Sequence, residues 1–120
     1  MATTNGTDKR CSERVQVNRT VEIQNPLQSV STPSYAKLLD LSNCGMAFVG
    51  TDTYPQDTEL TLVFTLPDYE SNHTLAIKSK VERSQEVHNK FLTGLTFSNL
   101  TQHESLVIRA YVNFHHRFQA

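Results

Sequence analysis

Residues Leu38 to Gly50 read LLDLSNCGMAFVG, and this stretch decides how the chain folds. Two short apolar runs are separated by the hexapeptide DLSNCG, so the runs are predicted to be strands and the break a reversal between them. Within the break, Asp40 supplies a carboxylate, Ser42 a hydroxyl, and Gly45 a position where positive φ or close backbone approach has no steric cost. The break is therefore either an ordinary hairpin turn, whose side chains bond its own amides, or a small polar binding site on a strand edge.

Strand-like alternation of apolar and polar residues continues on both sides of this stretch. It runs from Val15 to Ile23 before it, and through Leu60 to Leu66, Leu75 to Val81 and Phe91 to Phe97 after it. With Met46 to Val49 and the run before the break, this makes six short strands. Turn residues separate them, and such spacing is typical of an antiparallel barrel.

Three details within these strands carry their own expectations. Arg19 falls on the apolar parity, which predicts a bend near a strand end or a long side chain reaching past the core to water. Gly94 lies inside the last strand, which predicts a bulge or a point of close approach. The polar residues from Arg83 to Lys90 are interpreted as a turn.

A helix is predicted after the last strand, because Thr101-Gln102-His103-Glu104 has the form of a capping box. An apolar stripe follows at spacings of three and four residues, and we expect it to pack against the open end of the barrel. The stripe consists of Leu106, Val107, Ala110, Tyr111 and Phe114. The predicted fold is thus mainly β, a six-stranded antiparallel barrel with a C-terminal α-helix.

Length and composition limit the classes of function. The chain has 120 residues, a net charge of −1, five histidines and two cysteines. One domain is expected, without the broad basic face that a nucleic acid polymer requires. No apolar run approaches the roughly 18 residues that span a bilayer, and no apolar signal region opens the chain, so a cytoplasmic protein without membrane contact is expected. No metal-ligand spacing is present, and Cys11 and Cys44 are expected to be reduced.

The N-terminal residues combine a polar composition with a cluster of positive charges. Residues 1–13 are small, polar or charged, which predicts a flexible arm in front of a domain that covers residues 14–120. Lys9, Arg10 and Arg14 place three cations within six residues at the end of this arm. Alone, such a cluster is typical of a solvated junction. If the first two strands pair antiparallel, however, it comes to the same end of the barrel as the DLSNCG turn.

This arrangement resembles the PilZ domain family: RxxxR leads into a strand, DxSxxG follows about thirty residues later, and alternating strands and a C-terminal helix complete the chain. The family motifs map onto Arg10 and Arg14 and onto Asp40, Ser42 and Gly45, and the resemblance extends from Lys9 to about Tyr111. It implies a bacterial receptor for the second messenger cyclic di-GMP, with no enzymatic activity and no cofactor.

The residue chemistry agrees with the implied ligand. Arginine offers a planar fork for phosphate oxygens or for the O6/N7 edge of guanine. Asp40 can accept from guanine N1 and N2, Ser42 can bond a phosphate or steady the turn, and Gly45 lets the backbone approach. Lys9 precedes the first arginine, at the position that varies in the family and is linked there to binding one nucleotide or a stacked pair. Its charge favours a phosphate contact.

The resemblance also implies how such a receptor signals. A domain without catalytic groups must act through another protein, on motility, surface polysaccharide, attachment or virulence, and we expect nucleotide binding to order the arm. Two alternatives stay open: a PilZ-like domain that only binds proteins, and a small-barrel flavin binder or enzyme. Neither a nucleophile paired with a base nor a close carboxylate pair supports the second.

Overall fold

The structure is a computed structural model that describes residues 14–25, 34–67 and 71–119, with side chains to residue 115. It contains six strands and a helix in this part of the chain. Their bounds are β1 Val15–Gln24, β2 Ser34–Leu41, β3 Gly45–Gly50, β4 Glu59–Pro67, β5 Asn72–Val87, β6 Lys90–Phe97 and α2 Gln102–Gln119.

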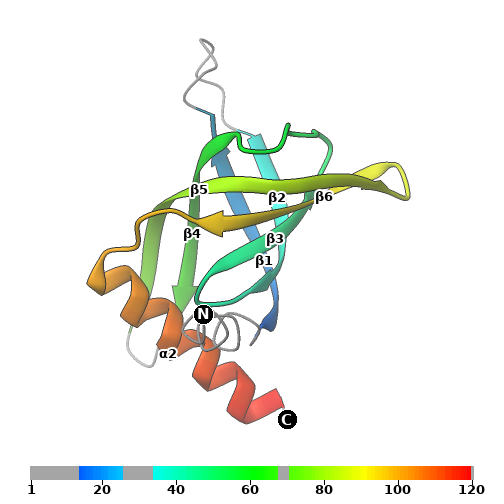
Figure 1. Ribbon diagram of the computed structural model, residues 1–120. Helices are drawn as coiled ribbons and strands as arrows, with labels where there is room; N and C mark the ends of the chain where they lie inside the picture. Colours follow the sequence, from blue (N-terminus) through cyan, green and yellow to red (C-terminus); the bar gives the residue numbers. More distant parts are fainter. Residues whose placement is uncertain (1–13, 26–33, 68–70, 120) are drawn as a thin grey trace, which may run out of the picture.

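The six strands form a closed antiparallel barrel in the order β1-β2-β3-β6-β5-β4 (Figure 1). The expected fold class is therefore confirmed. Closure depends on a short ladder between β1 and β4 at Glu22↔Val63, Ile23↔Leu62 and Gln24↔Thr61. The pairing of β1 with β2 shifts register between Gln16 and Arg19, and the Arg19 side chain is exposed. The bend that the sequence predicted at Arg19 is therefore a local irregularity within β1.

Inward-facing residues of all six strands fill the barrel. The largest fully buried side chains include Phe48 and Leu38, which are cross-strand partners in β3 and β2. Burying one side chain of this size contributes roughly 1.5–3 kcal/mol relative to exposure. Because side chains alternate in direction along a strand, the same residues that fill the core fix which residues face outward.

The prediction of a polar turn from Arg83 to Lys90 is wrong. Strand β5 continues to Val87 and pairs with β6 down to Lys90, so the reversal needs only His88 and Asn89. Both residues have positive φ, at 53° and 68°, as a two-residue hairpin requires. The hairpin extends to one side of the barrel (Figure 1). From Glu82 to Val87 every residue of β5 is exposed or half-buried, so the alternation of buried and exposed residues is lost there.

Helix α2 begins as predicted but buries a different face. Thr101 Oγ1 accepts from the Glu104 amide at 3.1 Å, and Glu104 Oε1 accepts from the Thr101 amide at 2.9 Å. Of the predicted stripe, Tyr111 is buried and Val107 packs against the core, whereas Leu106 and Phe114 are 54% and 42% exposed. Among the described side chains of α2, Ile108, Tyr111 and Val112 are buried. They have the same helical spacing as the predicted stripe, but the face is shifted by one residue. Among the described residues, no helix has the length and apolar character needed to cross a membrane.

Candidate functional site

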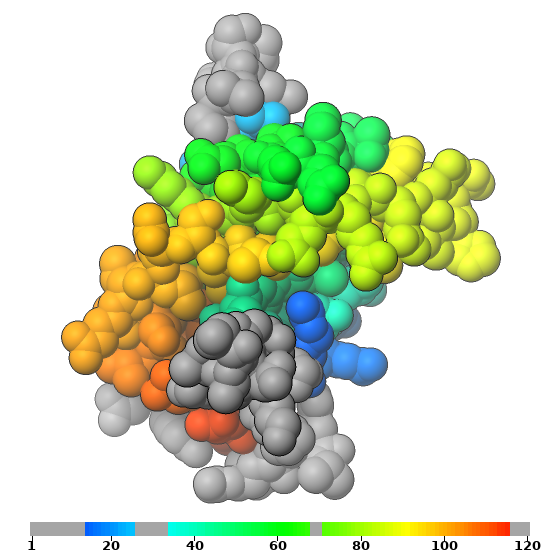
Figure 2. Space-filling model, in the orientation of Figure 1, coloured from blue at the N-terminus to red at the C-terminus, as the bar shows by residue number. Residues whose placement is uncertain are grey.

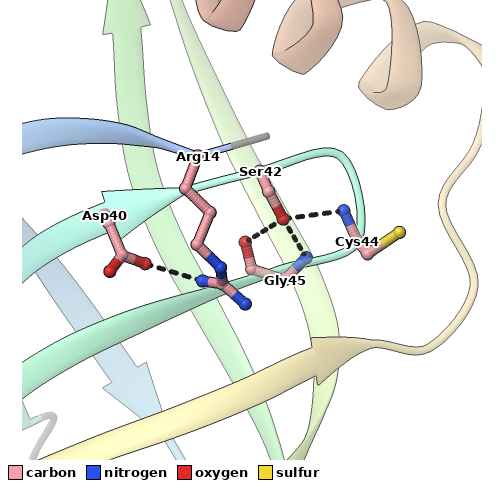
Figure 3. A network of polar contacts seen from close by, with 5 residues as sticks. All are labelled: Arg14, Asp40, Ser42, Cys44 and Gly45. Carbon is pink, nitrogen blue, oxygen red and sulfur yellow. Dashed lines mark hydrogen bonds and ion pairs between the residues drawn. The ribbon is translucent and has the colours of Figure 1, made fainter. Parts of the chain in front are cut away.

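The DLSNCG stretch forms the tight connection between β2 and β3, and Ser42 holds it together. The Ser42 side chain is fully buried, and its Oγ accepts from the amides of Cys44 and Gly45 at 3.2 Å each. The same hydroxyl donates to the Gly45 carbonyl at 3.4 Å, while the Ser42 amide donates to that carbonyl at 2.9 Å. In this structure, all hydrogen-bonding capacity of the Ser42 hydroxyl serves the turn (Figure 3).

Gly45 is required by the barrel itself. It has no positive φ, so the conformational freedom of glycine is not what the position uses. A Cβ atom there would lie 2.0 Å from the Leu95 carbonyl oxygen and 3.1 Å from the carbon of that carbonyl. The predicted close backbone approach is therefore present, and the approaching backbone is strand β6.

Arg14 and Asp40 meet where β1 begins and β2 ends. The register Val15↔Leu41 and Gln16↔Asp40 is the antiparallel pairing that the sequence argument required. It brings Arg14 Nη1 within 2.7 Å of Asp40 Oδ1, although the residues are 26 positions apart (Figure 3). Their side chains are 45% and 33% exposed. An ion pair with this much solvent contributes about 0–1 kcal/mol, so the fold does not depend on it.

The remaining cations of the first motif, Lys9 and Arg10, lie outside the described residues, as does the predicted arm. Cys11 lies outside them as well. Cys44 is disulfide-bonded in this structure, which differs from the expected reduced thiol.

The turn contains one further polar group that sequence reasoning missed. Asn43 Oδ1 is buried and has no hydrogen-bond partner in the structure. An unsatisfied buried acceptor costs about 1–3 kcal/mol, so a donor from water or from a ligand would stabilise the turn. Its position inside the DxSxxG segment was the available signal, but the motif pattern leaves that position unspecified.

The arrangement suits recognition of a small polar molecule. It presents an outward guanidinium and an outward carboxylate side by side, held by a turn whose own hydrogen bonds are made internally. Among the described residues, no group of three or more histidine, cysteine, aspartate or glutamate side chains is placed to hold a metal ion. The guanidinium can therefore donate, and the carboxylate accept, charge-assisted hydrogen bonds.

Comparison with solved structures identifies the same fold in proteins of low sequence identity. A structure of the Bacillus subtilis inhibitor of motility MotI/DgrA has a TM-score of 0.72 at 20% identity, covering 88% of this chain and 49% of that one. This chain thus spans about half the length of the Bacillus protein. The PilZ domain of YcgR from Escherichia coli, solved with c-di-GMP, has a TM-score of 0.68 at 10% identity, covering 88% of this chain and 90% of that one.

A third similar structure also contains c-di-GMP. PlzA from Borreliella burgdorferi in complex with c-di-GMP has a TM-score of 0.57 at 11% identity, covering 98% of this chain and 56% of that one. No curated protein matches the sequence. The family model for the PilZ domain matches residues 8–114, which include both motifs and all six strands. The chain therefore belongs to the PilZ domain family.

Proposed function

We propose that this protein is a receptor for cyclic di-GMP. The observation that carries the proposal is the 2.7 Å contact between Arg14 and Asp40, which joins one residue of each family motif into a single outward-facing site. YcgR and PlzA, which share the fold, were solved with this nucleotide. Cyclic di-GMP has two phosphates and two guanines, and so offers an anionic partner to arginine and paired donors to a carboxylate.

The proposed roles of the motif residues divide in two. Lys9, Arg10 and Arg14 bind phosphate oxygens or the O6/N7 edge of guanine, and Asp40 accepts from guanine N1 and N2. Ser42 and Gly45 contribute by fixing the turn, so that the Asp40 carboxylate is already in place before the ligand arrives.

The ion pair between Arg14 and Asp40 holds both side chains where each can exchange its contact with the other for a contact with the ligand. In the free protein each charge is the other's counter-ion, which keeps both side chains close to the position where a ligand needs them. Because an exposed pair of this kind contributes at most about 1 kcal/mol, a nucleotide that replaces one of its contacts loses little. Charge-assisted bonds to the ligand exceed that loss.

The guanine preference is the sharpest test of the function. A thermal-shift panel should show stabilisation of the wild-type protein by cyclic di-GMP, by about 2.7 kcal/mol at 100 times the dissociation constant, and no comparable effect of cyclic di-AMP, GTP or FMN. In Asp40→Ala, stabilisation by cyclic di-GMP should fall and its advantage over cyclic di-AMP should shrink, because adenine lacks the adjacent N1 and N2 donors.

Asp52→Ala is the matched control for that panel, since Asp52 is an exposed carboxylate beyond the opposite end of β3. A shift by FMN alone would favour the flavin-binding alternative. Absence of any nucleotide effect on a folded wild-type protein would favour the alternative of a domain that binds only proteins.

We also propose how binding becomes a signal. Arg10 belongs to a segment, residues 1–13, whose composition buries little apolar surface, and yet it must reach the same nucleotide as Asp40. Binding then orders the arm, at about 1–2 kcal/mol of backbone entropy per residue, and creates a surface that a partner protein recognises only in the complex. The output is control of motility, polysaccharide, attachment or virulence through that partner in the cytoplasm.

Hydrogen exchange tests this step separately from binding. With the protein kept reduced, so that Cys44 is not held in a disulfide, we expect amides from Lys9 to Arg14 to exchange rapidly in the free protein and slowly in the complex. The amides of β4 and β5 should change little and serve as the internal control. Equal protection of the arm with and without saturating nucleotide would refute the switch and leave the receptor function intact.

A further inference from the structure

Gly94 in the middle of β6 is a glycine that the fold does not explain. Its φ is not positive, and a Cβ built on it meets no atom of the described residues within 4 Å. A register shift between Val81 and Arg83 lies opposite, as the sequence suggested, but the extra residue belongs to β5 and does not require glycine on β6. Glycine weakens a strand interior, and where no bulge or neighbouring backbone demands it, a ligand that approaches closely is the remaining reason.

Gly94 lies in one row with the candidate site. The register places Asp40 opposite Ala47, Ala47 opposite Gly94, and Gly94 opposite Arg83, which crosses β2, β3, β6 and β5. Their side-chain positions alternate with those of the buried Met46, Phe48, Thr93 and Leu95, so the row faces outward. The two central positions bear a methyl group and a hydrogen, which leaves an open floor between a carboxylate and a guanidinium.

The dimensions of this floor suit one purine. Three inter-strand steps of about 4.8 Å separate the ends of the row, or roughly 14 Å between the backbones of Asp40 and Arg83. Part of this span is taken up by the two side chains that extend over it. Val49 and Leu92, paired with each other and half-buried, lie next to the floor along the strands and add apolar surface beneath a flat ring.

Arg83 is available for a ligand at the far end of the row. It is exposed, and among the described residues it has no ion-pair partner; its neighbour Glu82 accepts a hydrogen bond from Thr96 Oγ1. A surface hollow of about 640 Å³ is lined in part by Arg83 and Thr96, so the Arg83 side chain borders open space. Figure 2 shows the start of β1 on the same face of the molecule as β5 and β6.

We propose that a guanine of the bound nucleotide lies flat on Ala47 and Gly94, with Asp40 at its N1/N2 edge and Arg83 at the edge that carries O6 and N7. The proposal rests on the receptor function proposed above and adds Arg83 as a second determinant of guanine specificity. Arginine is the side chain best matched to O6 and N7, through its two parallel donors. Carboxylate and guanidinium together then read both polar edges of one base.

Isothermal titration with cyclic di-GMP and its 7-deazaguanine analogue tests the Arg83 contact. Arg83→Ala should bind cyclic di-GMP about 10-fold to 100-fold more weakly than wild type, since a charge-assisted contact is lost. Loss of N7 in the analogue should weaken binding to wild type more than binding to Arg83→Ala, because the variant has already lost the N7 contact that Arg83 makes. Arg109→Ala, on the exposed face of α2, is the matched control and should bind as wild type does.

Gly94→Val tests the floor. The side chain would occupy the space above the floor and reduce binding by more than 10-fold, while the melting temperature should not fall, because β-branched residues favour strands and a Cβ at this position meets no atom of the described residues within 4 Å. Ala76→Val adds the same side chain at an exposed position of β5 that pairs with β4, and should change neither property.

The outcomes separate this inference from the receptor function. If wild type binds cyclic di-GMP and Asp40→Ala binds it weakly, but Gly94→Val and Arg83→Ala bind as wild type does, the floor is not the base site and the inference is overturned. An equal loss with the 7-deaza analogue in wild type and Arg83→Ala would overturn the Arg83 contact. If the wild-type protein does not bind the nucleotide at all, the receptor function itself fails.

Discussion

Replacing Arg10 and Arg14 together by alanine should remove most of the affinity for cyclic di-GMP while the barrel still folds. Each arginine is assigned a charge-assisted contact worth roughly 1.5–3 kcal/mol, or about 10-fold to 100-fold in affinity, and the double substitution should exceed either single one. The fold should survive because Arg14 precedes β1, lies outside the core, and makes only an exposed ion pair with Asp40. Isothermal titration of the single and double variants measures the loss.

The control for that experiment removes two other exposed cations. Lys78 faces outward from β5 where it pairs with β4, and Arg109 is exposed on α2, so the double variant Lys78→Ala and Arg109→Ala changes the net charge by the same amount. It should bind as wild type does. A double Arg10 and Arg14 variant that retains wild-type affinity and melting temperature would refute the site.

Gly45→Ala should be the most destabilising single methyl group that can be added to this hairpin. The new Cβ would lie 2.0 Å from the Leu95 oxygen, and the obstructing atom belongs to the backbone of β6, so β3 and β6 must move apart where they pair. Overpacking of this kind costs about 3 kcal/mol at the upper end of the usual range. The midpoint of thermal unfolding should fall by roughly 10 °C.

Gly94→Ala provides a matched control, because it adds the same methyl group to the partner strand of the same ladder. Its Cβ meets nothing within 4 Å, so we expect unchanged or slightly higher stability. Circular dichroism melts of the two variants, recorded without nucleotide, make the comparison. Equal melting temperatures would show that the barrel adjusts around Gly45.

Much of the fold could be predicted because alternation and turn chemistry agree with each other. The β2 and β3 hairpin and the capping box of α2 follow from residues within a few positions of one another, and the antiparallel pairing of β1 with β2 was a hypothesis that the register confirms. The extent of β5 was missed because Ser84 and Glu86 lie in a hairpin beyond the core, where no apolar parity is imposed. The buried face of α2 was assigned only in part: Tyr111 packs inward as expected, but Leu106 and Ile108 lie on two overlapping stripes, and only tertiary packing chooses between them.

The site could be predicted in part. Arg14 and Asp40 were brought together correctly, because their contact depends only on antiparallel pairing. The row from Asp40 to Arg83 could not be found in the same way, since it depends on the order of four strands and on a register shift at Val81. The sequence indicates that Gly94 is unusual, but only the structure shows that a Cβ at this position would meet no atom of the described residues within 4 Å.

The Ser42 hydroxyl and Gly45 both serve the hairpin itself, and this affects how other sequences with the DxSxxG motif should be interpreted. Half of a DxSxxG signature can persist in a domain that has ceased to bind any nucleotide, since loss of the serine or the glycine would damage the hairpin whether or not a ligand is present. The outward half, Asp40 together with Arg14, contributes little to folding and is free to drift once binding no longer matters. A sequence that retains serine and glycine but has lost the aspartate and the arginines is therefore expected to be an intact barrel without the receptor function.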